Sequence, residues 1–166
     1  LDIEQVFDAC DSNTSAIIIN SPNNPSGWTM SQQEQKTLLE FTRKKGIWIV
    51  SDEVYARISF HANHAPSFCE VMEKDDRVIV VNSFSKSWAM TGWRLGWITA
   101  PVQLGTHFEK LNEYNVAGPP PFIQQAGITA LKKGEAFIRE SNARYLQALS
   151  YFTEWAKSQE RIEFDV

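Results

Sequence analysis

The sequence has little of several features that mark particular classes of protein. Its 166 residues include only two cysteines, Cys10 and Cys69, whose unrelated contexts argue against a disulfide framework or a zinc knuckle. No apolar run approaches the length of a membrane-spanning helix. The net charge is −4 and the basic residues are scattered, so no concentrated positive face is available for nucleic acid or an acidic membrane. We therefore expect a cytoplasmic protein that binds neither nucleic acid nor membrane.

Glycine and histidine are also sparse where a cofactor loop or a metal site would need them. Gly92 and Gly96 form neither a dinucleotide-binding fingerprint nor a Walker loop. His61, His64 and Cys69 are close in sequence, but they follow a loop instead of a helix face, and no second pair of ligands accompanies them. We expect no metal at this position, and the role of these three residues stays open.

Four apolar segments predict a sheet within one domain. They cover residues 16–20, 47–50, 78–82 and 95–100. A helix over residues 32–45 is predicted between the first two, because Ser31 and Glu34 have the spacing of a capping box and Gly46 supplies a stop. This strand, helix, strand spacing is typical of a parallel crossover, whereas the short connection before the fourth strand favours an antiparallel pairing. The predicted fold class is α/β.

Beyond Pro101 the pattern becomes helical. Helices are predicted over residues 102–115 and 121–133, separated by a proline-rich loop, and a long amphipathic helix follows. The sequence has no initiating Met and ends at Asp165 and Val166, directly after residues that resemble the start of a new strand. We therefore expect a piece of a longer protein.

Polar residues follow three of the predicted strands. The carboxyl ends of strands in an open parallel sheet meet at one edge, where ligands bind, so these residues are expected to converge. Each also has a simple structural interpretation: an asparagine in a turn, an aspartate that caps a loop, or a solvated lysine. The residues are Asn24, Asp52, Tyr55, Ser83, Ser85 and Lys86.

Together these positions form four motifs within residues 15–100. They read Asn-Asn-Pro-Ser-Gly from Asn23, Ser-Asp-Glu-Val-Tyr from Ser51, Ser-Phe-Ser-Lys from Ser83 and Gly-Trp-Arg-Leu-Gly from Gly92. In this order they resemble the class I/II aminotransferases, the aspartate-aminotransferase-like group of fold type I enzymes that use pyridoxal 5'-phosphate (PLP). The local sequence around Lys86 is similar to that of bacterial aspartate-type aminotransferases.

The resemblance implies a role for each residue in holding PLP. Lys86 would form the Schiff base with the cofactor and move a proton during the reaction, whereas Asp52 would pair with the pyridine nitrogen. Tyr55 and Asn24 would hydrogen-bond the phenolic oxygen of the cofactor.

The phosphate of PLP would be held by three further residues. Hydroxyl groups and a guanidinium are well suited to a phosphate. By resemblance these are Ser83, Ser85 and Arg94, the last of which lies eight residues beyond Lys86.

The resemblance also implies an architecture larger than this chain. It predicts a three-layer, mainly parallel sheet with helices on both faces, in which residues 1–158 belong to the large PLP-binding domain and residues 159–166 begin the small C-terminal domain. Family members are homodimers that act on an amino acid and a 2-oxo acid. The segments that stack on the cofactor and grip the substrate carboxylate are absent, so we expect no activity from the chain alone and leave the substrate open.

Two alternatives keep the same motifs. A PLP-dependent lyase or synthase on the same fold would retain every residue named above, and product analysis would distinguish it. An aminotransferase-like sensor domain of a transcription regulator would require a winged-helix domain upstream.

Overall fold

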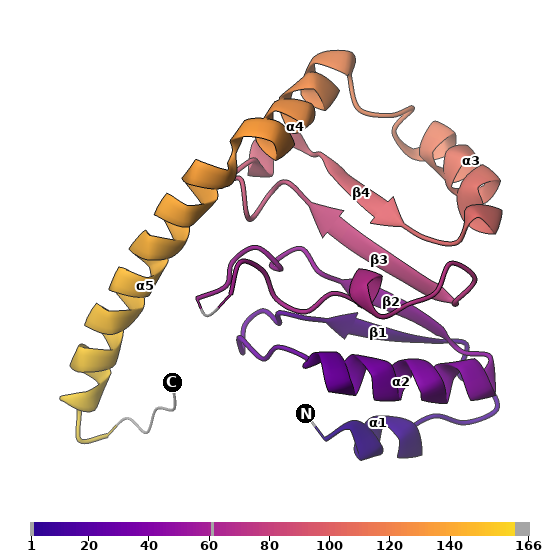
Figure 1. Ribbon diagram of the computed structural model, residues 1–166, viewed down its shortest axis with the longest axis horizontal. Coiled ribbons are helices and arrows are strands. Elements are labelled where there is room, and N and C mark those ends of the chain that lie inside the picture. The colour runs from indigo at the N-terminus through magenta and orange to yellow at the C-terminus, as the bar shows by residue number, and fades with distance from the viewer. Residues whose placement is uncertain (1, 61, 162–166) are drawn as a thin grey trace.

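The computed structural model describes residues 2–60 and 62–161, and within them a single mixed sheet forms the centre of the fold (Figure 1). Its strands lie in the order β1 (Ala16–Asn20), β2 (Trp48–Asp52), β3 (Val78–Ser83) and β4 (Gly96–Thr99). β1, β2 and β3 run parallel, and β4 pairs antiparallel with β3. The predicted mainly parallel α/β sheet, including its antiparallel fourth strand, is therefore confirmed.

The crossover between β1 and β2 is helix α2 (Gln32–Lys45), with the predicted bounds. The Ser31 hydroxyl accepts a hydrogen bond from the Glu34 amide, and the Glu34 carboxylate accepts one from the Ser31 amide, so the capping box is confirmed. Gly46 ends the helix in the left-handed region at φ 70°. Helix α1 (Ile3–Asp8) has too few residues for a periodic signal and packs on α2, where Phe7 stacks on Phe41 at 4.2 Å between ring centroids.

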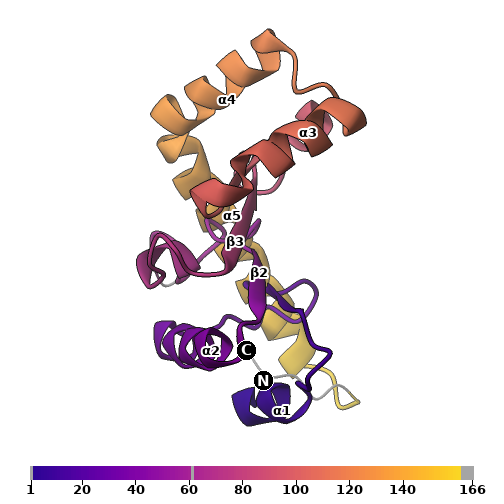
Figure 2. The same cartoon turned by 90° about the vertical axis from the view of Figure 1, so that its right-hand side faces the viewer.

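The hydrophobic core lies between α2 and one face of the sheet, as the edge-on view in Figure 2 shows. Side chains alternate across a strand, so β1, β2 and β3 each contribute every second residue to this core. On the opposite face Ile18 is 75% exposed and Ile98 is 48% exposed. The main core residues are Ile17, Ile19, Leu38, Leu39, Ile49, Phe68, Val78 and Val80.

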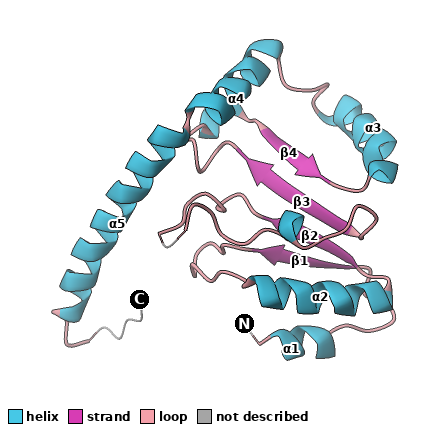
Figure 3. Cartoon of the chain, viewed as in Figure 1, coloured by secondary structure: helices cyan, strands magenta, loops and turns pink. Residues whose placement is uncertain are grey.

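Three helices follow the sheet, as predicted. They are α3 (Gly105–Asn115), α4 (Pro121–Lys133) and α5 (Glu135–Lys157). One short 3-10 helix, η3 (Val102–Leu104), directly precedes α3, and another, η2 (Thr91–Trp93), precedes β4. Pro121 is the first residue of α4, a position where a missing amide hydrogen costs nothing. Helix α5 runs beside the edge of the sheet toward which β1 and β3 point (Figure 3). The strand expected near the end of the chain falls on residues 162–166, outside the described part.

Two strands extend beyond their predicted ends, and both extensions affect the site, whereas β4 is one residue shorter at each end than the predicted 95–100. β2 continues through Ser51 to Asp52, and β3 continues to Ser83, so these polar residues belong to the strands instead of the loops after them. Backbone pairing explains the extension, because Asp52 pairs with both Asn20 and Val81. No helix among the described residues is long and apolar enough to span a membrane.

Candidate active site

The loop after β1 is held in place by Asn20, the last residue of that strand. The Asn20 side-chain oxygen accepts hydrogen bonds from the Asn24 amide at 3.0 Å and from Asn23 Nδ2 at 3.3 Å. Its Nδ2 donates to the carbonyl of Asp52 at 3.3 Å on the neighbouring strand. Asn20 therefore fixes the Asn24 backbone relative to the carboxyl end of β2. Sequence reasoning missed this residue, although an amide side chain at the end of an isoleucine run was a possible signal.

Asn24, Tyr55 and Lys86 come together although they follow three different strands. Asn24 Nδ2 donates to the Tyr55 hydroxyl oxygen at 3.0 Å. Lys86 Nζ lies 5.6 Å from the centroid of the Tyr55 ring, within the range of a cation–π contact. Because the Tyr55 oxygen accepts from Asn24, its own hydrogen is left to donate to a ligand. The Lys86 side chain is exposed, so its amine is accessible.

Asp52 is half-buried at the end of β2. One carboxylate oxygen accepts from the Val54 amide at 3.2 Å, which orients the carboxylate at the start of the following turn. Its side chain lies on the opposite face of the strand from Ser51 and Glu53, which contact each other.

The Ser83 and Ser85 pair lies at the end of β3. The Ser83 hydroxyl oxygen accepts from the Ser85 amide at 3.0 Å, and Ser85 is buried with 8% exposure. The Ser83 hydroxyl also lies 3.4 Å from the Leu95 carbonyl oxygen, which accepts from the Phe84 amide at 3.1 Å. These contacts join the Ser83 turn to the residue directly after Arg94.

Arg94 lies in the left-handed region at φ 51° directly after η2. Its side chain is exposed, and its guanidinium donates to the Thr91 carbonyl at 3.1 Å. The structure thus brings Arg94 close to Ser83 along the backbone without a described contact between the two side chains.

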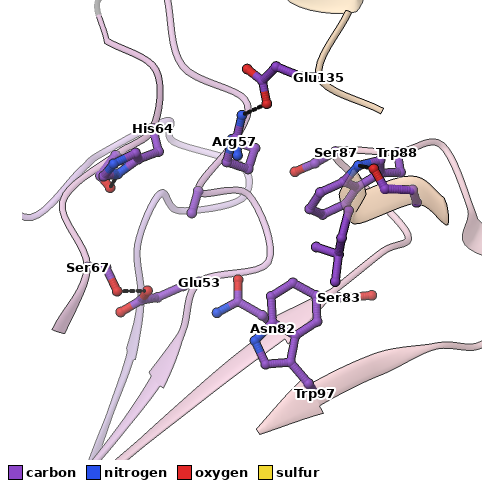
Figure 4. A pocket seen from close by; sticks show the side chains of 14 residues that line it. Glu53, Arg57, His64, Ser67, Asn82, Ser83, Ser87, Trp88, Trp97 and Glu135 are labelled. Carbon is purple, nitrogen blue, oxygen red and sulfur yellow. Dashed lines mark hydrogen bonds and ion pairs between the residues drawn. The ribbon is translucent and has the colours of Figure 1, made fainter. Parts of the chain in front are cut away.

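A cavity of about 240 Å³ lies beside this group, between the segment after β2 and the junction of α4 and α5 (Figure 4). Arg57 and Glu135 both line it and form an ion pair at 2.5 Å. Trp88, two residues after Lys86, lines the cavity and donates from Nε1 to the Ala130 carbonyl at 3.1 Å. Asn142 of α5 donates to the carbonyl oxygens of Arg57 at 2.9 Å and Ser59 at 3.2 Å. Helix α5 is therefore joined to the chain segment that carries Tyr55.

The histidine and cysteine cluster shows ordinary contacts where it is described. His64 Nδ1 lies 2.9 Å from the Ala65 carbonyl oxygen, and its Nε2 lies 3.6 Å from Glu70. Cys69 is exposed, and His61 lies outside the described residues. In the described part of the chain no group of three or more His, Cys, Asp or Glu side chains has the arrangement of a metal site.

The fold is an open α/β sheet with a group of polar side chains at the carboxyl ends of its parallel strands, the edge at which such sheets bind ligands. The sequence profile described as aminotransferase class I and II matches residues 1–162. The chain belongs to this family, whose members depend on PLP.

Individual relatives agree with the family match. The chain is 41% identical over 119 residues to the arginine–pyruvate transaminase AruH of Pseudomonas aeruginosa, a match that covers 72% of this chain and 30% of the relative. It is 37% identical over 147 residues to an aspartate aminotransferase of Pyrococcus horikoshii, with coverage of 87% and 37%. The matched part of the chain thus spans about a third of the length of these relatives.

Solved structures show the same fold. An aromatic aminotransferase from Pyrococcus horikoshii superposes with a TM-score of 0.81 at 33% identity, covering 89% of this chain and 40% of that one. A Thermus thermophilus aspartate aminotransferase mutant complexed with tryptophan superposes with a TM-score of 0.85 at 27% identity, covering 93% and 40%.

The residues present fit the cofactor that this family uses. The exposed amine of Lys86 suits the aldehyde of PLP, and the Asp52 carboxylate suits its protonated ring nitrogen. The Tyr55 phenol, whose hydrogen is uncommitted, suits the ionised ring oxygen. Ser83 and Arg94 supply hydroxyl and guanidinium donors for a phosphate.

Proposed function

We propose that the full-length protein is a PLP-dependent aminotransferase that transfers an amino group between an amino acid and a 2-oxo acid. The convergence of Asn24, Tyr55 and Lys86 in a chain of this family supports the proposal most directly, because none of these residues is near the others in sequence. We further propose aspartate as the amino donor to test first, since aspartate aminotransferases are among the relatives. We also propose that the full-length protein is a cytoplasmic homodimer. Its large domain would end at residue 158, and its small C-terminal domain would begin at residue 159.

Lys86 would hold the cofactor through its amine and, once released, would take and return the proton at the α-carbon of the substrate. When bound, the cofactor supplies a protonated ring that withdraws electrons from that carbon. The Asp52 carboxylate would keep the ring nitrogen protonated, and its orientation by the Val54 amide supports this role.

Tyr55 would donate its hydroxyl hydrogen to the phenolic oxygen of the cofactor. The Asn24 amide favours this direction, because it already donates to the lone pair of the Tyr55 oxygen. Asn24 would also hydrogen-bond the phenolic oxygen with its second amide hydrogen. Both bonds would stabilise the ionised oxygen and lower the pKa of the lysine-bound cofactor.

The phosphate would be held by Ser83, Ser85 and Arg94. The 3.4 Å separation of the Ser83 hydroxyl from the Leu95 carbonyl is too long for a strong hydrogen bond, so this donor can turn to an anion at little cost. Arg94 is exposed and makes a single described hydrogen bond, which leaves most of its donors available.

Reduction of the full-length protein with borohydride, followed by peptide mapping, tests the assignment of Lys86. The reagent fixes the cofactor on the lysine that holds it, so we expect the label on the peptide that contains Lys86. A label on Lys110 or on another lysine would refute the assignment. Formation of glutamate from 2-oxoglutarate and aspartate then tests transamination independently of the label.

A further inference from the structure

Glu53 is a buried acidic residue without a basic partner among the residues described. Its side chain is 2% exposed, and all three groups that donate to it are neutral. The Ser51 hydroxyl donates to Oε1 at 3.0 Å, and the Phe68 amide donates to Oε1 at 2.9 Å. The Ser67 hydroxyl donates to Oε2 at 2.6 Å (Figure 4). Burial raises the pKa of Glu53, and the three hydrogen bonds oppose that effect. Burying a carboxylate without a basic partner costs free energy, so a role beyond packing is expected for Glu53.

The three donors come from the two ends of one loop. Ser51 belongs to β2, whereas Ser67 and Phe68 begin the 3-10 helix η1 (Phe68–Glu70). Ser67 and Phe68 are 14 and 15 residues beyond Glu53 in sequence. By bonding to both, the Glu53 carboxylate holds together the two ends of the segment 54–66. Tyr55 is part of that segment.

The backbone of Glu53 is fixed as firmly as its side chain. Its amide donates to the Val81 carbonyl at 2.9 Å, and its carbonyl accepts from the Ala56 amide at 2.9 Å. Tyr55 thus lies inside a turn that begins at Glu53, and Asp52 directly precedes that turn. Ser51 and Glu53 contact each other on one side of the strand, so Asp52 points to the other side. Glu53 can influence the site only through these neighbours.

We propose that Glu53 is a positioning residue of the cofactor site, which holds the Asp52 carboxylate and the Tyr55 phenol in place by closing the loop 54–66. This inference rests on the proposed function. Catalytic groups must be held within a fraction of an ångström by residues that do not themselves touch the ligand, and Glu53 has the burial and the bonds to do this.

Two substitutions separate the geometry of Glu53 from its charge. In Glu53→Gln the amide oxygen can accept from Ser51 and Phe68, and the amide nitrogen can donate to the Ser67 hydroxyl oxygen. In Glu53→Ala the buried Phe68 amide loses its acceptor, and both ends of the loop are released. We expect the glutamine variant to resemble the wild type and the alanine variant to differ from it.

The first measurement is a pH titration of the absorption band of the lysine-bound cofactor in the full-length protein. A hydrogen bond from Tyr55 lowers the pKa of that band, so Tyr55→Phe defines the direction of change. We expect Glu53→Ala to raise the pKa in the same direction, by about 0.4–1 unit, the equivalent of one net hydrogen bond. Leu39→Ala, in the core on α2, is the matched control that lowers stability without reaching the site.

Ser67→Ala provides a milder test if the alanine variant at Glu53 does not fold. It removes one donor from Oε2 and leaves the two bonds to Oε1, so a smaller shift in the same direction is expected. Glu53→Gln and Leu39→Ala should titrate as the wild type does. A wild-type titration in both Glu53→Ala and Ser67→Ala, with a shift in Tyr55→Phe, would overturn the proposal.

The second measurement uses the protein without cofactor. We expect amide hydrogen exchange in residues 54–66 to be at least about tenfold faster in Glu53→Ala than in Glu53→Gln, relative to the amides of α2, because the loop opens without global unfolding. Unchanged relative exchange would overturn the proposal. If wild-type protein with PLP shows no band from a lysine-bound cofactor, the proposed function fails and this inference fails with it, whereas a normal band with unshifted variants refutes the inference alone.

Discussion

The junction between α4 and α5 provides a test of how closely the helices pack on the Lys86 segment. Gly134 lies between the two helices, and its amide donates to the Ala130 carbonyl at 2.8 Å. A Cβ atom added at Gly134 would overlap that carbonyl oxygen and would lie 2.7 Å from Trp88 Nε1. The same carbonyl accepts from Trp88, so neither neighbour can move without losing a hydrogen bond.

The expected cost of Gly134→Ala follows from two opposing effects. Replacing glycine by alanine in a compatible conformation stabilises a protein by about 0.4–1 kcal/mol through the unfolded state. Forcing extra volume into a packed site costs about 1–3 kcal/mol. Since the overlap at Gly134 involves backbone, we expect the steric cost to dominate and the variant to lose about 1–2 kcal/mol of unfolding free energy.

Two other glycines calibrate this expectation within the same chain. Gly105 has no atom within 4 Å of an added Cβ, so Gly105→Ala should gain about 0.4–1 kcal/mol. At Gly127 the added atom would meet Leu95 Cδ2 at 2.5 Å and Phe84 Cζ at 3.2 Å. The Leu95 side chain can rotate away, so Gly127→Ala should lie between the other two.

Urea denaturation of the full-length protein and its three variants measures these differences, provided that the slope with denaturant is unchanged. Gly134→Ala should also weaken PLP binding, because Trp88 is two residues from Lys86 and would be displaced. If Gly134→Ala proves as stable as Gly105→Ala, the packing of Trp88 against the helix junction is looser than the structure shows, and the steric cost expected at Gly134 is refuted.

Two further predictions concern the site and the acid stability of the fold. Asp52→Asn should retain the cofactor but slow transamination by about a hundredfold, because the carboxylate charge assists the electron withdrawal directly. Tyr55→Phe should slow it by less than about tenfold. Single-turnover kinetics measure both, and equal losses would contradict this order. The Arg43 guanidinium, bound to Asp76 at 2.6 Å, holds the pKa of that carboxyl below its usual 3.8. The pair therefore contributes stability above pH 3.8 that is lost as the pH falls through the lowered value, and denaturation at a series of acid pH values should show a flatter decline in Asp76→Asn.

Much of the fold follows from short-range signals. The Ser31 capping box, the left-handed Gly46 and the apolar spacing between them determine both boundaries of α2. The continuous apolar strands and the crossover length are likewise local, and they give the parallel order of β1 to β3. The last residues of β2 and β3 carry no such local signal, because they belong to the sheet only through pairing with neighbouring strands.

The order of polar residues along the chain already determined which side chains gather at the carboxyl edge, since parallel strands leave them no other place. Only the tertiary structure decided how they contact one another. The Asn24–Tyr55 hydrogen bond joins residues 31 positions apart, and the Asn142 bond to Arg57 joins residues 85 apart. Glu53 shows the same division, because its sequence neighbours reveal a motif, but its partners Ser67 and Phe68 become neighbours only when the loop closes. Contacts of this kind depend on strand register and helix packing. Many residues far apart in sequence set these together, so no local sequence pattern predicts them.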